Sequence, residues 1–459
     1  MPSPSASVYA PIKIYTRAAS GRFTRLRWLM VWLTQIVFYA TPWLQWNGRQ
    51  AVLFDLEARR FYLFNLVLYP QDFIYLTLLL ILCALGLFFV TTLAGRIWCG
   101  FACPQTVYTK VFMWLQQRFE GDRSARMRRD AAPWSAQKLA RKSGTQISWV
   151  ALSLWTGFTF VAYFTPAHTL AAAGLQGGWG PWEMFWVFFY ALALYGNAGY
   201  LREQVCKHMC PYARFQSAMF DADTLIIGYD AQRGEPRGKP AADKAAGDCI
   251  DCTLCVQVCP TGIDIRDGLQ SNCIGCAACI DACDDVMTKI GAPIGLVRYS
   301  THNAMEQGRT HVHWREAVRR PRVLVYGGLL LAVAVGLVAG LALRKPLKVN
   351  VIRDRGVMAR TVEYGAVENV YRLQVMHALE HAQRYRIAVQ GEDGVEVRLR
   401  EPVELELASA EERSVPVAVR LGADQALKFS GQSVGIRFSV QAVGEGTSVT
   451  EGSRFLVPR

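Results

Sequence analysis

The sequence predicts a multidomain membrane protein that combines transmembrane helices with a small cysteine-rich α+β domain and a C-terminal all-β domain. Three observations predict this class. Of the 459 residues, 52% are apolar and only 19% are charged, a balance that excludes disorder and favours a membrane protein. All 13 cysteines lie between Cys83 and Cys283. From about residue 346 onward, short alternating apolar and polar stretches replace the long apolar runs.

Hydropathy predicts five transmembrane helices, because five apolar stretches each approach the ~20 residues that cross the hydrocarbon core. Tryptophan and tyrosine gather near several of their ends, as in the aromatic belts of membrane proteins. The predicted spans are residues 28–46, 73–93, 147–164, 182–201 and 323–343.

The distribution of lysine and arginine predicts the orientation of these spans. Residues 1–27 contain basic but no acidic side chains, and residues 104–146 and 301–322 are strongly basic, whereas residues 165–181 contain no Lys, Arg, Asp or Glu. Basic loops stay in the cytoplasm, so we expect the N-terminus inside and, after five spans, the C-terminus outside. Topology thereby explains the formal net charge of +13, and no nucleic-acid recognition module is apparent.

Composition divides the chain into seven predicted segments. They are a basic cytoplasmic N-terminus (1–27), a four-helix membrane region (28–227), a linker (228–247), a cysteine-rich domain (248–300), a basic connector (301–322), the fifth span (323–343) and a β-domain (346–459). The linker is rich in Gly, Pro, Lys and Asp, which favours a flexible tether.

The β-domain is predicted to be an antiparallel β-sandwich of about a hundred residues. Its alternating stretches are residues 370–375, 385–389, 395–399, 415–421 and 434–440, and turn residues separate them.

Eight cysteines form two runs with the same C-x2-C-x2-C-x3-C spacing. This spacing is typical of bacterial ferredoxins with two 4Fe-4S clusters, in which the fourth cysteine of each run binds the cluster of the other run. We therefore predict one cluster at Cys249, Cys252, Cys255 and Cys283, and the other at Cys273, Cys276, Cys279 and Cys259. Zinc is the alternative, but a four-cysteine zinc site needs neither the two triplets nor the x3 step. Asp284 stands where the first run has Pro260, which leaves the ligand count intact.

Two further cysteine pairs, Cys99 with Cys103 and Cys206 with Cys210, each follow a predicted two-span hairpin and precede a proline. The recurrence suggests an internal duplication. Spacing of i, i+4 places both thiols on one helical face, and the proline is expected to end that helix. We predict that these four membrane-edge thiols converge as a redox or metal site, because thiolates select Cu(I), zinc or iron-sulfur clusters. The alternative is inert buried cysteine, which we expect for Cys83.

Several other cofactors have no recognisable site. None of the seven histidines lies within a predicted span, which disfavours intramembrane b-type haem. No G-x-G-x-x-G motif follows a predicted strand, so no NAD or flavin site is apparent. Met376, His377 and His381 are residue types that copper accepts, but we expect a solvated loop between strands there. Electrons must come from a donor that the sequence leaves unidentified.

The run GDCIDCTLCVQVCPTGIDIRDGLQSNCIGCAACIDACDDVMTK at residues 247–289, with RGEPRG at 233–238 and GLVRY at 295–299, resembles the cytochrome c oxidase accessory proteins of the FixG and CcoG type. The similarity extends over essentially the whole chain. It implies five spans in a bacterial inner membrane, a cytoplasmic dicluster ferredoxin domain, membrane Cys-x-x-x-Cys-Pro motifs and a periplasmic immunoglobulin-like domain.

The resemblance also implies a function in the assembly of a heme-copper oxidase, through reduction of Cu(II) to Cu(I) for its copper centre. Heme-copper oxidase subunits or copper chaperones are then the expected partners, and the membrane-edge thiols are the expected copper site. Two alternatives stay open. In the first, the chain is a membrane ferredoxin that passes quinol electrons to another reductase. In the second, it is a scaffold whose β-domain binds oxidase subunits.

Overall fold

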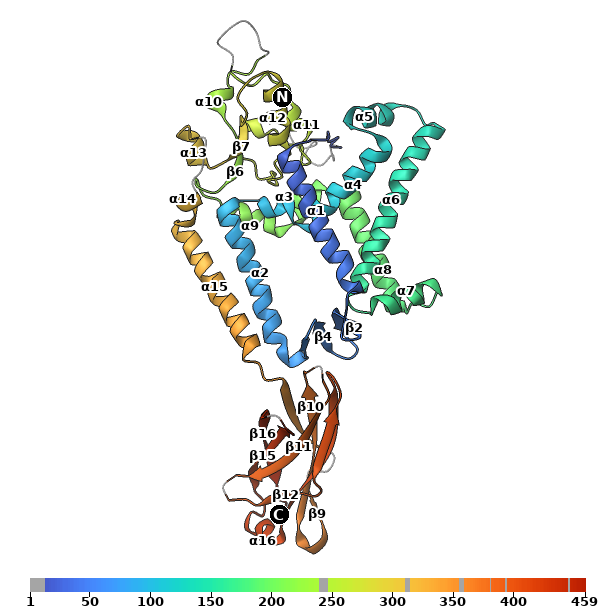
Figure 1. The fold of residues 1–459 in the computed structure, drawn as a ribbon, viewed down its shortest axis with the longest axis vertical. Helices are drawn as coiled ribbons and strands as arrows, with labels where there is room; N and C mark the ends of the chain where they lie inside the picture. The colour runs from blue at the N-terminus through green and yellow to red at the C-terminus, as the bar shows by residue number, and fades with distance from the viewer. Residues whose placement is uncertain are drawn as a thin grey trace, which may run out of the picture. The chain divides into compact units, whose positions relative to one another are not determined.

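The computed structural model describes residues 13–238, 247–309, 314–354, 359–379, 381–392, 394–444 and 446–459. The chain forms two compact units (Figure 1). Unit 1 comprises Met1–Trp43 and Ile74–Val338, and unit 2 comprises Leu44–Phe73 and Ala339–Arg459.

Unit 1 is mainly helical. Its first part contains α1 (Arg22–Ala40), η1 (Thr41–Trp43), α2 (Phe73–Ala94), α3 (Ile97–Phe101), α4 (Pro104–Glu120), α5 (Arg123–Ala131), α6 (Ala136–Val161), α7 (Ala167–Leu175), α8 (Pro181–Leu194), η3 (Tyr195–Leu201), η4 (Val205–Met209) and α9 (Pro211–Met219). The elements η3 and η4 are π-helices.

Three helical stretches among the described residues are long and apolar enough to cross a membrane, namely Pro70–Ala94, Pro181–Leu201 and Pro321–Ala342. They coincide with the second, fourth and fifth predicted spans. The other two predicted spans coincide with α1 and α6, which are helical but less apolar. Helix α1 contains several arginines and ends at Ala40, and α6 begins with the basic sequence AQKLARK. The five-span topology therefore stays a prediction.

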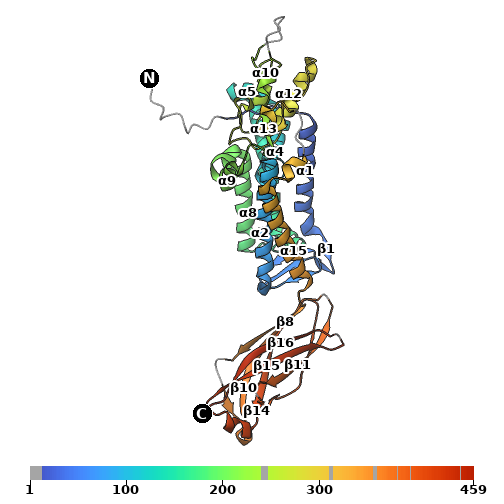
Figure 2. The same ribbon diagram turned by 90° about the vertical axis from the view of Figure 1, so that its left-hand side faces the viewer.

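Small residues let the long helices approach closely, as is common between membrane helices. At Gly157 of α6, an added Cβ would lie 2.3 Å from the carbonyl oxygen of Val187 in α8. Helices α2 and α15 (Pro321–Ala342) lie side by side (Figures 1 and 2), with Gly327 of α15 facing Phe89 of α2.

The cysteine-rich domain of unit 1 is built on a two-stranded antiparallel sheet. Strand β6 (Ile226–Tyr229) pairs with β7 (Val297–Ser300). The other elements are α10 (Ala231–Gly234), α11 (Leu254–Gln257), η5 (Ile265–Asp267), α12 (Ala278–Lys289), α13 (His302–Glu306) and α14 (Trp314–Val318).

The predicted linker at 228–247 needs a correction, because its first residues are ordered parts of this domain. Gly228 and Tyr229 belong to β6, and α10 follows. The strand forms because Ile227 and Tyr229 are buried in the domain core together with Val297. Residues 239–246 of the predicted linker lie outside the described residues.

Helix α1 is attached to this domain through its N-terminus. Both carboxylate oxygens of Asp281, in α12, accept hydrogen bonds from the backbone amides of Phe23 (3.0 Å) and Thr24 (2.6 Å). An acidic group there satisfies two unpaired N–H groups and the positive end of the helix dipole. Gly21 leaves room for the carboxylate, because an added Cβ would lie 2.4 Å from the Asp281 side chain.

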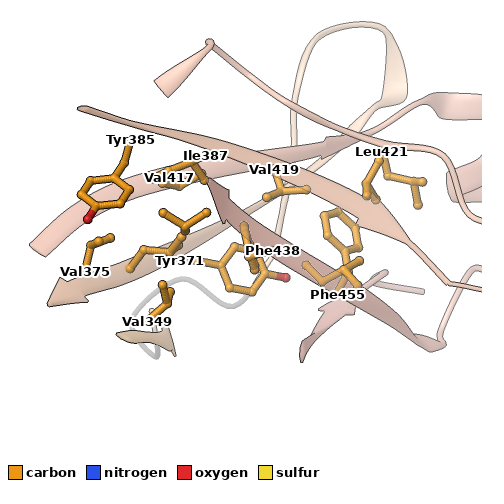
Figure 3. Close-up of a cluster of buried hydrophobic side chains, with 14 of the residues drawn as sticks. Val349, Tyr371, Val375, Tyr385, Ile387, Val417, Val419, Leu421, Phe438 and Phe455 are labelled. Atoms are coloured by element: carbon orange, nitrogen blue, oxygen red, sulfur yellow. The ribbon is translucent and has the colours of Figure 1, made fainter. Parts of the chain in front are cut away.

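The C-terminal part of unit 2 is an antiparallel sandwich, which confirms the predicted all-β domain. One sheet has the strand order β12-β14-β10-β8, with β9 also beside β10, and the other has the order β13-β11-β15-β16. The elements are β8 (Leu347–Arg353), β9 (Arg360–Thr361), η6 (Glu363–Gly365), β10 (Val367–His377), β11 (Gln383–Gly391), β12 (Val397–Leu399), β13 (Val403–Leu407), β14 (Glu412–Leu421), α16 (Ala423–Lys428), β15 (Ser433–Ala442) and β16 (Ser448–Leu456). Tyr371, Phe438 and Phe455 are fully buried between the sheets (Figure 3).

Residues 44–73 pack against this sandwich. They form β1 (Gln45–Trp46), β2 (Arg49–Gln50), β3 (Val52–Asp55), β4 (Arg60–Leu63), β5 (Leu66–Leu68) and η2 (Pro70–Asp72). Tyr62, Val67 and Tyr69 share an apolar cluster with Met376, and the Tyr69 hydroxyl donates to the carbonyl oxygen of His377 (3.0 Å).

The expectation of a solvated loop at Met376 and His377 is therefore wrong. Both residues end β10 and are buried, at 2% and 0% exposure. The two nitrogens of the His377 ring lie 2.7 Å from the Tyr385 hydroxyl and 2.7 Å from the carbonyl oxygen of His381. This histidine is thus a hydrogen-bonded core residue.

We expect Asp72→Asn to destabilise unit 2 by about 3–5 kcal/mol, because it leaves two partly buried cations without their anion. The Asp72 side chain is buried and pairs with Arg344 (2.8 Å) and Lys348. The urea midpoint of the purified chain, followed by pulse proteolysis, measures the effect. Glu404→Gln is the control, since its pair with Arg386 is exposed and such pairs contribute only about 0–1 kcal/mol. Equal midpoints for the two variants would contradict the prediction.

Candidate redox centre

Four cysteines line one cavity in the cysteine-rich domain, and we call them the first site. They are Cys249, Cys252, Cys255 and Cys283. Cys249 and Cys252 come from the segment that leads into α11, Cys255 lies in α11, and Cys283 comes from α12. Leu254, Val286 and Leu296 make the remaining wall largely apolar. These are the four cysteines that the spacing groups as one cluster, and their ligation stays a prediction.

A second cavity has the other four cysteines in its wall, and we call these the second site. They are Cys259, Cys273, Cys276 and Cys279. Ile227, Ile263 and Ile274 enclose them. Cys255 lines both cavities, so the two sites are direct neighbours.

The backbone winds both triplets by the same unusual turns. Positive φ angles occur just before and just after the middle cysteine of each triplet, at Asp251 (52°) and Thr253 (56°) and at Gly275 (67°) and Ala277 (57°). Such angles are uncommon in residues other than glycine, and their recurrence at equivalent positions indicates a functional constraint. The turns wrap three thiols around each cavity, which fits the thiolate coordination of a 4Fe-4S cluster.

Burial favours the protonated form of several of these thiols. It raises the pKa of Cys273 and Cys283 to about 12 and that of Cys255 to about 11. Metal binding must therefore displace protons from these cysteines. In the described part of the chain, no three His, Cys, Asp or Glu side chains are placed to hold a single metal ion. The eight cysteines of the first and second sites instead surround the two cavities.

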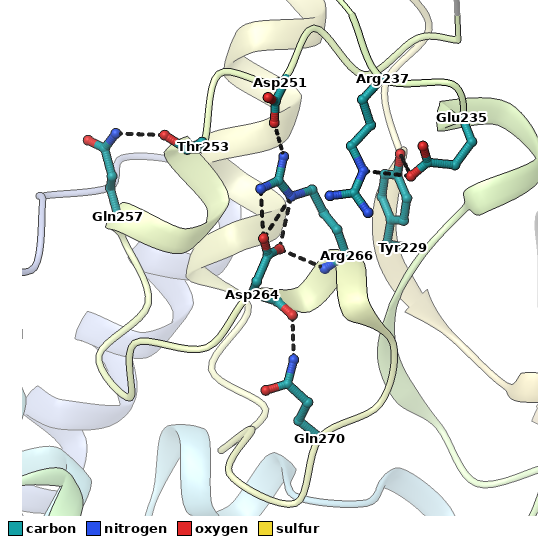
Figure 4. Close-up of polar contacts among 9 residues, drawn as sticks. All are labelled: Tyr229, Glu235, Arg237, Asp251, Thr253, Gln257, Asp264, Arg266 and Gln270. Carbon is teal, nitrogen blue, oxygen red and sulfur yellow. Dashed lines mark hydrogen bonds and ion pairs between the residues drawn. The ribbon is translucent and has the colours of Figure 1, made fainter. Parts of the chain in front are cut away.

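Arg266 braces the first site, and the sequence analysis did not identify it. Its guanidinium pairs with Asp251 (2.5 Å) and Asp264 (2.6 Å), and it lines the first cavity (Figure 4). Tyr229, which lines the same cavity, donates its hydroxyl hydrogen to Glu235 (3.2 Å). These contacts tie together the segments that carry the first triplet.

The membrane-edge pairs share one local geometry. The amide of Cys103 donates to the carbonyl oxygen of Trp98 (2.9 Å), and the amide of Cys210 donates to that of Val205 (2.8 Å), so each bond spans five residues. This shared geometry supports the predicted duplication. The expectation that the proline ends the helix with the cysteine pair needs a correction. The second cysteine of each pair caps the next helix, α4 or α9, and the following proline occupies its first turn, a favoured position for proline.

The structure brings the four membrane-edge thiols near one another, although among the described residues no three of them are placed to hold a single metal ion. Cys99 lies within electrostatic reach of Cys206, and Cys103 lies within reach of Cys210. Burial raises the pKa of Cys99 to about 12 and that of Cys206 to about 11. The Cys99 thiol also donates to the side-chain oxygen of Gln216 (3.4 Å), which is fully buried.

Cys83 and His208 are not part of this group. Cys83 is exposed on α2, so the expectation that it packs inside the protein is wrong. His208 lies between Cys206 and Cys210, but it is exposed. The connector histidines His311 and His313 lie outside the described residues.

Helix α3, which carries Cys99, lies directly against the second site. An added Cβ at Gly100 would lie 2.6 Å from the carbonyl oxygen of Gly275 and 2.9 Å from the Cα of Cys276. The Arg96 guanidinium, just before α3, donates to the carbonyl oxygen of Cys273 (3.4 Å). The first site, the second site and the membrane-edge thiols therefore follow one another in space.

A second contact joins the other membrane-edge pair to the same site. The Lys207 ammonium donates to the carbonyl oxygen of Thr261 (3.0 Å), and the Thr261 hydroxyl lies 3.3 Å from the Cys259 sulfur. Gly100 and Lys207 each adjoin a membrane-edge cysteine in sequence. Their importance follows from their contacts with residues 261–276, which the sequence does not reveal.

Three segments match known protein families. Residues 201–302 match the 4Fe-4S dicluster domain, and residues 337–458 match the immunoglobulin-like fold at the C-terminus of FixG. Residues 76–121, which contain Cys99 and Cys103, match a 4Fe-4S binding domain.

Two characterised relatives match most of the chain. It is 39% identical to nitrogen fixation protein FixG of Rhizobium meliloti, over 84% of this chain and 81% of that protein. It is 38% identical to protein RdxA of Cereibacter sphaeroides, over 85% of each chain. Among solved structures, a FixG-related protein from Vibrio parahaemolyticus is 23% identical and covers 25% of this chain and 97% of that one, with a TM-score of 0.21.

Proposed function

Because the chain belongs to the FixG family of iron-sulfur proteins, we propose that it passes electrons through two 4Fe-4S clusters to the membrane-edge thiols. There it reduces Cu(II) to Cu(I) for a heme-copper oxidase. The observation that carries this proposal is the contact of α3 with the second site, where Gly100 lies between Cys99 and the backbone of Gly275 and Cys276.

The residues of the two sites suit this chemistry. A bound 4Fe-4S cluster supplies one electron at a time. The first and second sites hold their cysteines around neighbouring cavities with Cys255 in both walls, and a short separation favours electron exchange. The apolar side chains in both cavity walls limit the contact of the sites with water, although Cys252 of the first site is exposed.

Copper is the substrate in this scheme. A Cu(II) ion takes up one electron and becomes Cu(I), which soft thiolates hold more favourably than Cu(II). The thiols of Cys99 and Cys206 have raised pKa values because they are buried, so they release protons to water as the metal binds. The electron comes from a reduced cluster, and an electron donor must reduce that cluster again before the next turnover.

We place the protein in a bacterial inner membrane with five spans. In this topology α1 and α6 are the two less apolar spans, the cysteine-rich domain is cytoplasmic, and the β-sandwich is periplasmic, where the absence of cysteine after Cys283 suits an oxidising compartment. The bilayer and heme-copper oxidase subunits or copper chaperones are the proposed partners. The electron donor is not identified.

Anaerobic reduction of Cu(II) tests the proposed activity. Protein reduced with dithionite and then freed of it is mixed with Cu(II), and a chromophoric Cu(I) chelator reports the product. Two one-electron clusters predict about two Cu(I) per chain beyond the yield of a control, the same holoprotein with its clusters oxidised, which has the same free thiols. A yield equal to that control would contradict the proposal.

A second candidate function has support from a specific observation. The match of residues 76–121 to a 4Fe-4S binding domain suggests that the membrane-edge thiols hold a further cluster, as in a membrane ferredoxin that serves another reductase. Iron analysis separates the two cases, because two clusters contain eight irons and three contain twelve. A scaffold role predicts instead that oxidase assembly in cells survives loss of the membrane-edge thiols and fails when residues 347–459 are deleted.

A further inference from the structure

We propose that four cationic side chains raise the reduction potential of the cluster at the second site above that of the cluster at the first site. Electrons then enter at the first site and leave from the second, next to the membrane-edge thiols. The four side chains are Arg27, Arg96, Lys110 and Lys207. This inference rests on the proposed function only in requiring that both clusters are present.

Arg96 and Lys207 contact the loops that carry the second-site cysteines. Arg96 is 7% exposed, and its guanidinium donates to the carbonyl oxygen of Cys273 (3.4 Å). The Lys207 ammonium donates to the carbonyl oxygen of Thr261 (3.0 Å). An arginine is always charged in a protein, so at least one permanent positive charge is held against this site.

Arg27 and Lys110 bring two more cations to the same site from helices α1 and α4. Lys110 lies within electrostatic reach of Cys276 and of Arg27, and its ammonium is 5.5 Å from the centre of the Trp28 ring. Arg27 is 7% exposed. Two neighbouring cations that are largely removed from water are costly unless an anion compensates them.

Asp281 is the carboxylate at this place, and its negative charge offsets one of these cations. Asp281 lies within reach of Lys110, but both of its oxygens accept backbone hydrogen bonds from Phe23 and Thr24 at the start of α1. A cluster with four thiolates is itself anionic and gains a further negative charge on reduction. The cations are therefore placed to favour its reduced form.

The first site has the opposite surroundings. Its one lining cation, Arg266, faces two carboxylates, those of Asp251 and Asp264. Asp284 adds a third carboxylate within electrostatic reach of Cys283. Two further arginines near this site are each matched by a carboxylate, Arg237 by Glu235 (2.6 Å) and Arg233 by Asp248 (2.5 Å). The nearby acidic charge therefore still exceeds the basic charge, which disfavours the addition of an electron at this site.

Burial of the second site lowers the reduction potential of its cluster, but we expect the cations to raise that potential by more. The second site is the more enclosed of the two, since Cys252 of the first site is exposed, and a dry environment disfavours added charge. The same dry environment strengthens each nearby cation, because the effective dielectric constant is low. Net charge and solvent exposure both set cluster potentials, and here four cations outnumber the carboxylate of Asp281.

The exposed position of Cys252 fits this direction of transfer. A soluble or membrane donor can approach the first site from the side of Cys252, whereas α3 covers the second site through Gly100. An electron that enters at the lower-potential site moves downhill toward the membrane-edge thiols.

An EPR-monitored redox titration of the holoprotein tests the proposal. We expect two reduction potentials, with the higher one lowered in Lys110→Met and in Lys207→Met and the lower one unchanged. Lys289→Met is the matched control, because Lys289 is an exposed cation paired with Asp285 on α12, and it should shift neither potential. Lys207→Met keeps the test decisive if Lys110→Met fails to fold.

Variants that each lack one ligand assign the two potentials. Cys259→Ala should remove the higher-potential signal, and Cys283→Ala should remove the lower one. A single shared potential, the opposite assignment, or a shift of the lower potential in Lys110→Met would overturn the inference. Iron content shows separately whether both clusters are present, and failure of Cu(II) reduction with the two potentials ordered as expected would count against the proposed function alone.

Discussion

Simultaneous replacement of Cys99, Cys103, Cys206 and Cys210 by serine is expected to lower the Cu(I) yield of the dithionite-reduced protein to that of holoprotein with oxidised clusters, while the iron content stays unchanged. Serine hydroxyls are hard ligands and do not stabilise Cu(I) as thiolates do. The eight cysteines of the two sites are untouched, so eight irons per chain should remain. Cu(I) yield and iron content of the same preparation measure both parts of the prediction.

A matched control for this variant is Cys83→Ser. Cys83 is exposed on α2, and it lies outside the group of membrane-edge thiols, so its replacement should leave both the Cu(I) yield and the iron content unchanged. Full activity in the four-serine variant would show that copper is reduced elsewhere. Loss of about four irons would assign a further cluster to these thiols.

The second large effect is expected from Cys259→Ala, which should halve the iron content by removing the cluster of the second site. Cys259 follows the first triplet in sequence, but it lines the cavity of Cys273, Cys276 and Cys279. Alanine removes one of four thiolates and leaves the other site complete. Iron and sulfide per chain, together with the EPR signal that remains, measure the outcome.

Comparison with a first-triplet variant makes this prediction specific. Cys249→Ala should remove the same EPR signal as Cys283→Ala, because both cysteines line the first cavity. If Cys249→Ala and Cys259→Ala remove the same signal instead, the ligands are grouped by sequence run and the assignment by cavity is wrong.

The cysteine sites could be largely predicted from the sequence because their spacing is local information. Each triplet is contained in a short loop, and the turns at Thr253 and Ala277 follow from that spacing. The grouping of Cys283 with the first triplet was also predictable, since it follows a general rule for dicluster ferredoxins. The alternating strands of the β-sandwich were predictable for the same reason, because their pattern is local.

Contacts between distant segments could not be predicted in this way. Gly100 is significant only because Gly275 and Cys276 lie against it. The Tyr69 hydroxyl, 308 residues away in sequence, donates to the carbonyl oxygen of the buried His377, a contact that local polarity does not reveal, so a solvated loop was expected. The cations around the second site come from four separate segments of the chain. From the sequence, basic residues were attributed only to membrane topology.

Hydropathy predicted some of the membrane helices more clearly than others. It identified the stretches that became α2, α8 with η3, and α15. It was less decisive for α1 and α6, in which charged residues share the helix with apolar ones. The ion pair between Asp72 and Arg344 could not be predicted from the sequence either, because each residue alone is an ordinary charge beside an apolar span.

The central claim is that electrons pass from the clusters to copper at the membrane-edge thiols. Rapid anaerobic mixing of the reduced protein with Cu(II), with cluster oxidation and Cu(I) formation followed together, tests it most directly. The account predicts that one Cu(I) appears for each cluster oxidised, at the same rate, and that the clusters of the four-serine variant stay reduced. Cu(I) formation without cluster oxidation, or equal rates in the variant, would contradict the claim.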